Sequence, residues 1–238
     1  MRPNPTQTSL VTLFLFTILA MPALAVDYHV EMLVFANNDE AAFHSEQWSL
    51  EAQPPAVDDS LALFDGHVRA GFRRLDPIQL ERNLGEARRL LESSGHYTVL
   101  RHVAWQQPGL SAEDAVRIRL HGGEDYSLQY PERMQPRLEV GEDGTIVEIP
   151  GPERLEQLDG TVRVILGRYL HVHTDLVLRK PVVVERIDQE SGEPTQMPVL
   201  LDIPMQEQRR MRSRELHYID HPLLGVLVQI TPLETPAE

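Results

Sequence analysis

The sequence contains no cysteine and a single lysine, Lys180. Without cysteine the protein has no disulfide bond, no cysteine nucleophile and no thiolate zinc site, so burial must stabilise it. A lipid anchor on cysteine is excluded for the same reason. No Gly-x-Ser-x-Gly elbow and no lysine-containing phosphate loop is present. We therefore predict no catalytic residue and no cofactor.

Positive charge is also scarce. The chain of 238 residues has 22 Lys and Arg against 36 Asp and Glu, a formal net charge of −14. Nucleic acids and anionic lipid surfaces select basic proteins, so neither is an expected partner. A chain of this length can still bury a substantial core.

The first 25 residues have the pattern of a secretory signal peptide. A short, weakly basic start precedes an apolar run over residues 10–20, and Ala23-x-Ala25 supplies the small residues that signal peptidase requires. The run is shorter than the roughly 20 apolar residues that cross a bilayer. We expect cleavage after Ala25, a mature chain beginning at Val26, a periplasmic location and no membrane span.

Apolar and polar residues alternate in many segments, which is typical of strands that are half buried. We predict an α+β fold, mostly antiparallel sheet with long strands and one main amphipathic helix. The expected strands are residues 28–35, 97–105, 115–120, 138–140, 145–149, 161–178, 181–187, 199–206, 209–219 and 225–230.

The predicted helix begins at Asp76, followed by proline at the first helical position, and ends near Gly95. Its apolar stripe is Leu80, Leu84, Ala87 and Leu91. We expect residues 26–238 to form a single domain, with residues 123–159, rich in Gly, Pro and acidic residues, as a candidate sub-division. Tyr126 and Tyr130 are expected at the surface as stacking platforms, and Trp105 in the core.

The densest charged feature is a run of arginines near the C-terminus. On a continuous strand, Arg210, Arg212 and Arg214 share one side with Tyr218. Neighbouring guanidinium groups need anionic partners and suit carboxylates. These partners are either the protein's own acidic residues or the carboxylates of a ligand. Close by lie His217, Asp220 and His221, followed by a proline that turns the chain.

A second group of polar residues is His171-x-His173-x-Asp175, on one face of a predicted strand. Together with His217 and His221 it suggests a zinc site with one open position. The other interpretation is that these histidines line a half-polar sheet face. Because this spacing is common, we predict no metal site.

Several segments resemble one known family. They are residues 28–35, 97–108, 160–164, 168–172, 175–176 and, most specifically, 209–228. Together they are similar to the CsiV family, periplasmic peptidoglycan-binding proteins of Gammaproteobacteria. The resemblance implies a role in cell-wall assembly, cell shape and septation. It also implies an outer-membrane lipoprotein partner that activates a penicillin-binding synthase, and it implies no defined binding residues.

We therefore expect a non-enzymatic protein that binds peptidoglycan through a sheet face around residues 210–221. Its predicted ligand-binding residues are Arg210, Arg212, Arg214, His217, Tyr218, Asp220 and His221. One alternative is a metal-dependent wall hydrolase that uses His171, His173, His217 and His221. Another is a protein–protein adaptor without affinity for glycan.

Overall fold

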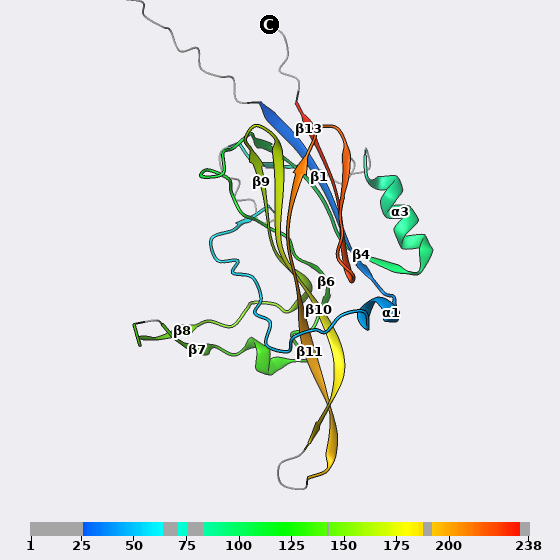
Figure 1. Cartoon of the computed structure of the whole chain (residues 1–238). Coiled ribbons are helices and arrows are strands. Elements are labelled where there is room, and N and C mark those ends of the chain that lie inside the picture. Colours follow the sequence, from blue (N-terminus) through cyan, green and yellow to red (C-terminus); the bar gives the residue numbers. More distant parts are fainter. Residues whose placement is uncertain (1–25, 64–70, 76–82, 142, 188–191, 234–238) are drawn as a thin grey trace, which may run out of the picture.

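Two antiparallel sheets face each other in the computed structural model, which describes residues 26–63, 71–75, 83–141, 143–187 and 192–233 (Figure 1). One sheet has five strands in the order β12-β13-β1-β4-β3. In that order the strands are Leu216–Ile219, Leu224–Pro232, Asp27–Asn37, Tyr97–Pro108 and Arg73–Arg74.

The other sheet has six strands, in the order β11-β10-β9-β5-β2, with β6 also paired to β9. These are Pro194–Met211, Leu170–Ile187, Glu156–Leu166, Ile118–Arg119, Leu61–Ala62 and, for β6, Gly122–Asp125. Among the described strand pairs only β2 with β5 is parallel. The mainly antiparallel fold with long strands is therefore confirmed.

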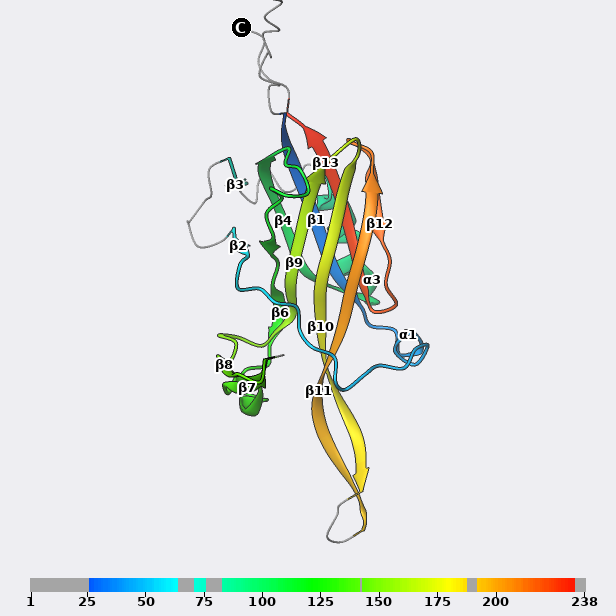
Figure 2. The same ribbon diagram turned by 60° about the vertical axis from the view of Figure 1, so that its left-hand side comes forward.

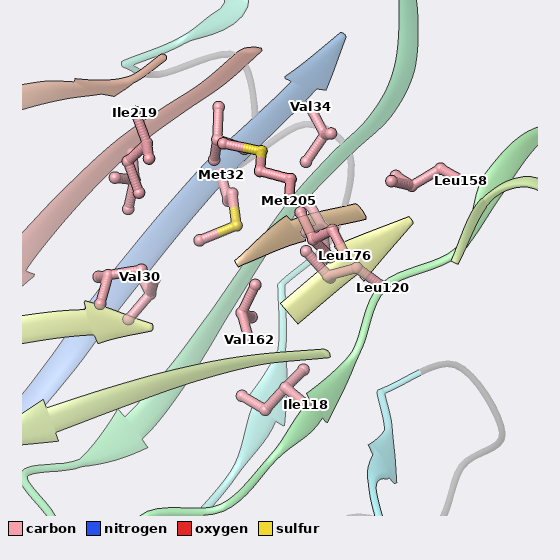
Figure 3. Packing of buried hydrophobic residues seen from close by; sticks show 14 of the residues in the cluster. Val30, Met32, Val34, Ile118, Leu120, Leu158, Val162, Leu176, Met205 and Ile219 are labelled. Carbon is pink, nitrogen blue, oxygen red and sulfur yellow. The ribbon is translucent and has the colours of Figure 1, made fainter. Parts of the chain in front are cut away.

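The core lies between the two sheets, where alternate residues of facing strands meet (Figure 3). Val30, Met32 and Val34 project inward from β1, and each is fully buried. Val162 of β9 and Leu176 of β10 project inward from the other sheet. This alternation is the period-two pattern of the sequence, and burying it is what brings the sheets together. Trp105 is also fully buried, as predicted.

Several strand boundaries differ from the sequence prediction. The run predicted over residues 161–178 is a hairpin, in which the Gly167 amide donates to the Tyr169 carbonyl between β9 and β10. Strand β10 then continues through Pro181 to Ile187, and β11 begins at Pro194, earlier than the predicted strand 199–206. The β10–β11 hairpin extends beyond the sandwich (Figure 1).

Helices are short in the described part of the chain. They are α1 (Glu40–Phe43), the 3-10 helix η1 (Pro131–Met134) and α3 (Gly85–Ser94). None of them is long and apolar enough to span a membrane. Figure 2 shows α3 behind the five-stranded sheet, on the side away from the six-stranded one.

The end of helix α3 matches the sequence prediction. Gly95 follows it in the left-handed conformation, at φ 70°. Leu84 is buried and Ala87 and Leu91 are half-buried, whereas Leu90 is exposed. The predicted start at Asp76, and Leu80, lie outside the described residues.

The segment between β6 and β9 packs on the outer face of the six-stranded sheet, in the lower half of the view in Figure 1. It contains η1 and the hairpin of β7 (Arg137–Val140) and β8 (Ile146–Ile149). Tyr126 and Tyr130 are buried there with Leu155 and Leu200, so their prediction as surface platforms is wrong. Nearby loop composition suggested exposure, but these two rings fill a small second apolar cluster.

Candidate functional site: the outer face of the six-stranded sheet

The arginine run does not lie on one strand. Strand β11 ends at Met211, residues 212–215 form a turn, and β12 begins at Leu216 in the other sheet. Arg214 lies in this turn with φ 68°. The prediction of a continuous strand over residues 209–219 is therefore wrong, because the chain crosses here from one sheet to the other.

The turn is fastened to β13 through its backbone. The Arg214 amide donates to the Ile230 carbonyl at 2.7 Å, and Gln229 Nε2 donates to the Arg214 carbonyl at 3.0 Å. The Arg212 amide donates to His217 Nε2 at 3.3 Å. The Arg212 side chain is 3.7 Å from a carboxylate oxygen of Glu215. His217 thus supports the corner between the sheets.

Tyr218, Asp220 and His221 lie at the other end of β12, away from Arg210. The Tyr218 hydroxyl donates to Asp220 Oδ1 at 2.7 Å, and burial together with this bond raises the pKa of Tyr218. His221 Nδ1 accepts from the Leu223 amide at 3.2 Å. Burial lowers the pKa of His221, although the charges of nearby acidic residues oppose the shift.

Arg210 belongs to a different surface, the outer face of the six-stranded sheet. Its guanidinium carbon lies 4.9 Å from the centroid of the Tyr169 ring, a cation–π contact. The strand register places Arg210 beside His171 of β10. The next row on the same face is Gln208, His173 and Arg163, from β11, β10 and β9. Arg210 therefore extends a polar surface that crosses three strands.

A groove of about 420 Å³ opens on this surface. Its lining comes from the segment before β5 and from β9, β10 and β11: Arg117, Thr161, Arg163, His173, Thr174, Asp175, Gln206, Glu207 and Gln208. Lower on the same face, the segment with Tyr126 and Tyr130 covers the sheet. The groove is therefore the open, upper part of the outer face.

The charged side chains that line the groove are two arginines, Arg117 and Arg163, and two carboxylates, Asp175 and Glu207. Asp175, a carboxylate of its outer face, accepts a hydrogen bond from Gln206 Nε2 at 3.0 Å. Burial, and then the charges of Arg163 and His171, lower the pKa of His173, so this imidazole is neutral at pH 7. The positive charge at neutral pH therefore comes from Arg163 and Arg117.

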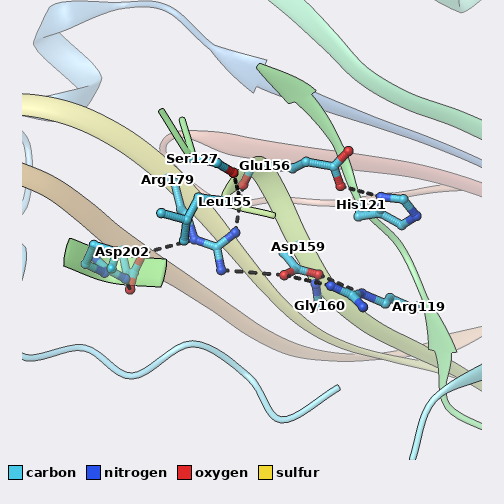
Figure 4. A network of polar contacts seen from close by, with 10 residues as sticks. Arg119, His121, Ser127, Leu155, Glu156, Asp159, Gly160, Arg179 and Asp202 are labelled. Carbon is cyan, nitrogen blue, oxygen red and sulfur yellow. Dashed lines mark hydrogen bonds and ion pairs between the residues drawn. The ribbon is translucent and has the colours of Figure 1, made fainter. Parts of the chain in front are cut away.

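The neighbouring arginines of this face have carboxylate partners (Figure 4). Arg119 Nε is 3.1 Å from Asp159 Oδ1, and Arg179 lies 3.5 Å from both Asp159 and Asp202. Arg133 completes the network at Asp202. Asp159 is shared by Arg119 and Arg179, and Asp202 by Arg179 and Arg133, so these arginines are already paired within the protein and their role is structural.

Arg163, Arg117 and Arg210 differ from the arginines of this network. Among the described residues, none of the three has a carboxylate within ion-pair distance. Arg117 donates to the Ala56 carbonyl, and Arg210 lies over the ring of Tyr169. Guanidinium groups without an internal anion are suited to an external one.

The four histidines of the hydrolase alternative are not assembled into one site. His171 and His173 are on β10 of the six-stranded sheet, whereas His217 is on β12 of the five-stranded sheet. Within the described ranges, no three His, Asp or Glu side chains form a group that could hold a metal ion.

Sequence reasoning missed Arg117, Arg163 and Gln208. In the sequence, Arg163 is a polar residue within an alternating predicted strand, and Arg117 is a polar residue within the alternating run 115–120. Nothing else in the sequence marks either residue. These residues come together on one sheet face only because β5 pairs with β9 and β9 pairs with β10. Periodicity within one strand carries no information on that pairing.

Comparison with known proteins gives a family. A family model described as "Peptidoglycan-binding protein, CsiV" matches residues 7–233, nearly the whole chain. Neither the curated proteins nor the solved structures contain a significant match. This chain belongs to the CsiV family of peptidoglycan-binding proteins.

Proposed function

We propose that this protein binds peptidoglycan through the groove on the outer face of its six-stranded sheet and acts without catalysis. One observation carries the assignment of the site. Arg163 and Arg117 line a groove of about 420 Å³, and Arg210 lies on the same outer face. None of the three has a carboxylate partner among the described residues, in a chain of net charge −14.

The ligand chemistry follows from these side chains. Peptidoglycan stem peptides carry several carboxylates, and guanidinium groups bind carboxylates by paired hydrogen bonds. A hydrogen bond to a charged group contributes about 1.5–3 kcal/mol. His173 and Gln208, on the same row as Arg163, add neutral groups for the amides of the peptide. The family description supports the choice of polymer.

The corner residues are proposed as an extension of this surface. Arg212 and Arg214 lie in the turn that follows β11, so they bring two further cations to the corner between the two sheets. His217 holds the Arg212 backbone, so we assign it a positioning role.

The location and processing of the protein are part of the proposal. We propose that residues 1–25 direct export and are removed after Ala25, which leaves a periplasmic chain of net charge −15, because Arg2 is the only charged side chain removed. Strand β1 begins at Asp27, two residues later. The intact mass of the protein purified from periplasm tests this: it should correspond to a chain starting at Val26.

We also propose that the protein supports wall assembly and septation through an outer-membrane lipoprotein that activates a penicillin-binding synthase. The family resemblance supports this part.

A protein partner needs an apolar surface. Hairpin β7–β8 exposes Leu138, Val140 and Ile146 on one face, each about 70% accessible. Replacing the three by threonine should abolish recovery of the lipoprotein and leave wall binding intact.

Sedimentation with purified sacculi tests the central part of the proposal. Wild-type protein should pellet, and Arg163→Ala should bind roughly tenfold more weakly, the loss expected for one charge-assisted hydrogen bond. A variant with Arg117, Arg163 and Arg210 all changed to alanine should stay in the supernatant. Arg89→Ala is the matched control, because it removes the same charge from an exposed position on α3.

The outcomes separate the claims. If the triple variant pellets like wild type, the groove is not the site. If wild-type protein does not pellet, wall binding itself is wrong. A further variant with Arg212 and Arg214 changed to alanine should show a smaller loss than the triple variant.

A further inference from the structure

A second surface of the molecule carries exposed aromatic rings. It lies on the outer face of the five-stranded sheet, so the sandwich separates it from the groove. Tyr218 of β12, Phe35 of β1 and Tyr97 of β4 project from this face, at the end of the sheet where β4 begins. The side chains of Tyr218 and Tyr97 are 44% and 36% accessible, whereas Phe35 is buried beneath them.

The three rings have a fixed arrangement. The rings of Phe35 and Tyr218 are nearly parallel, at 9°, with centroids 6.2 Å apart. Tyr97 meets Phe35 edge-on, at 85° and 5.3 Å. Gly225 of β13 lies under Phe35, where a Cβ atom would be 2.3 Å from the ring. A side chain at this position would therefore displace Phe35 and disrupt the row.

Polar groups border the rings. The Tyr218 hydroxyl is held by Asp220 Oδ1 at 2.7 Å. Asp220 is exposed, and its Oδ2 accepts no hydrogen bond from the described residues. At the Tyr97 end, Asn38 Nδ2 donates to Thr98 Oγ1 at 3.0 Å. The surface thus combines flat apolar rings with a rim of exposed hydrogen-bonding groups.

This combination has the chemistry of a carbohydrate site. A pyranose ring has an apolar face of C–H groups and an equatorial belt of hydroxyls, so it requires an aromatic face and polar groups at its edge. Tyrosine supplies both. A peptide or lipid partner would favour a more continuous apolar patch, without an exposed carboxylate at its edge.

We propose that Tyr218 and Tyr97, with Phe35 buried beneath them, form a glycan subsite in which the tyrosine rings stack an N-acetylhexosamine ring and Asp220 accepts from a sugar hydroxyl. The inference rests on the proposed function, because it assigns the sugar strand of the same polymer to this face. The groove on the opposite sheet contacts stem peptides. The protein would therefore engage the two components of the wall on two different faces.

The experiment uses a probe that has the sugar and lacks the peptide. The full-length mature protein is titrated with tetra-N-acetylchitotetraose, which carries no charge, and the aromatic side-chain signals are followed by NMR. The rings of Tyr97 and Tyr218 should shift. Tyr218→Ala and Tyr97→Ala should each weaken binding by roughly two- to tenfold, the range expected for one aromatic contact.

Matched variants distinguish stacking from folding and from the groove. Tyr218→Phe keeps the ring and should retain most of the affinity, whereas Asp220→Asn should reduce it. Arg163→Ala should bind the tetrasaccharide like wild type. Thermal unfolding of each variant checks that the fold is intact.

Failure of the inference and failure of the proposed function give different results. If wild-type protein pellets with sacculi but the tetrasaccharide shifts neither tyrosine, the glycan subsite is wrong, and wall binding through the groove is judged separately by the triple arginine variant. If the tyrosine variants keep the tetrasaccharide and instead lose a co-purifying protein, the surface is a protein interface and the inference is overturned. If sacculi are not bound at all, both proposals fall.

Discussion

The guanidinium of Arg210 lies over the ring of Tyr169, 4.9 Å from its centroid, at the upper end of the outer face of the six-stranded sheet. Arg168 approaches the same ring, at 5.6 Å. Tyr169 is 43% accessible, so it is held by these cations rather than by the core. The ring orients Arg210 without neutralising its charge, which leaves the cation available to a ligand.

Replacing Tyr169 with leucine should therefore weaken wall binding without unfolding the protein. An exposed cation–π contact contributes about 0.5–1 kcal/mol, so affinity for sacculi should fall roughly two- to fivefold. Sedimentation isotherms measure the change, and urea unfolding checks stability. Tyr169→Phe, which keeps the ring, should behave like wild type. Equal losses for leucine and phenylalanine would contradict the cation–π role.

The pH dependence of binding should report His173. Its pKa is lowered by burial and by the charges of Arg163 and His171, and the facing strand β11 presents the neutral Gln208. A bound carboxylate favours the imidazolium, so binding takes up a proton. Affinity for soluble muropeptides should rise as pH falls from 7.5 to 5.5, where stem-peptide carboxylates stay ionised. Calorimetry at several pH values measures this rise.

His173→Gln should remove that component of the pH dependence. The effect of His173 on folding stability has the opposite pH dependence: stability falls as pH falls, whereas affinity rises. Because the folded pKa of His173 lies below the unfolded value, the unfolded chain binds more protons as pH falls through about 6.5, and stability is lost there. A pH profile that is the same in wild type and His173→Gln would refute the assignment.

A buried carboxylate connects helix α3 to the five-stranded sheet. Glu31 of β1 is fully buried, and its Oε1 accepts from the Leu84 amide at 3.0 Å and from His102 Nε2 at 2.9 Å. Glu31→Ala leaves both donors without an acceptor and should destabilise the fold by about 3–5 kcal/mol. Glu31→Gln keeps an acceptor and should cost less. Urea unfolding at pH 7 measures both, and an alanine variant within about 1 kcal/mol of wild type would disprove this role.

Gly225→Ala should disturb the aromatic row selectively. The new Cβ would lie 2.3 Å from the Phe35 ring, so the ring must move, at a cost of about 1–3 kcal/mol. The near-ultraviolet circular dichroism of the aromatic side chains should change, and tetrasaccharide affinity should fall. Gly167→Ala is the control, because its Cβ would meet no atom closer than 3.9 Å. An unchanged spectrum in Gly225→Ala would argue against the rigid row.

Local patterns were enough to predict most strands, because burial between two sheets imposes a period of two on each. They failed at residues 212–215. Met211 and Ile219 are both buried and are separated by an even number of positions, so the alternation stays in phase across the turn. Tyr126 and Tyr130 were misplaced because their partner Leu200 is distant in sequence.

The candidate site was predicted only in part. Arg210 was identified from the density of charge, and it lies on the outer face that contains the groove. Arg163 and Arg117 become neighbours only through long-range strand pairing, which a single sequence does not reveal. Tyr218 and Asp220 were grouped with the arginines by proximity in the chain, but the change of sheet places them on the opposite face.

An NMR titration of isotopically labelled protein with soluble muropeptides tests the central claim most directly. Signals of Arg163, His173 and Gln208 should shift in a saturable manner, and the shifts should disappear when the stem-peptide carboxylates are amidated. Saturable shifts that cluster elsewhere and leave these three residues unchanged would contradict the account.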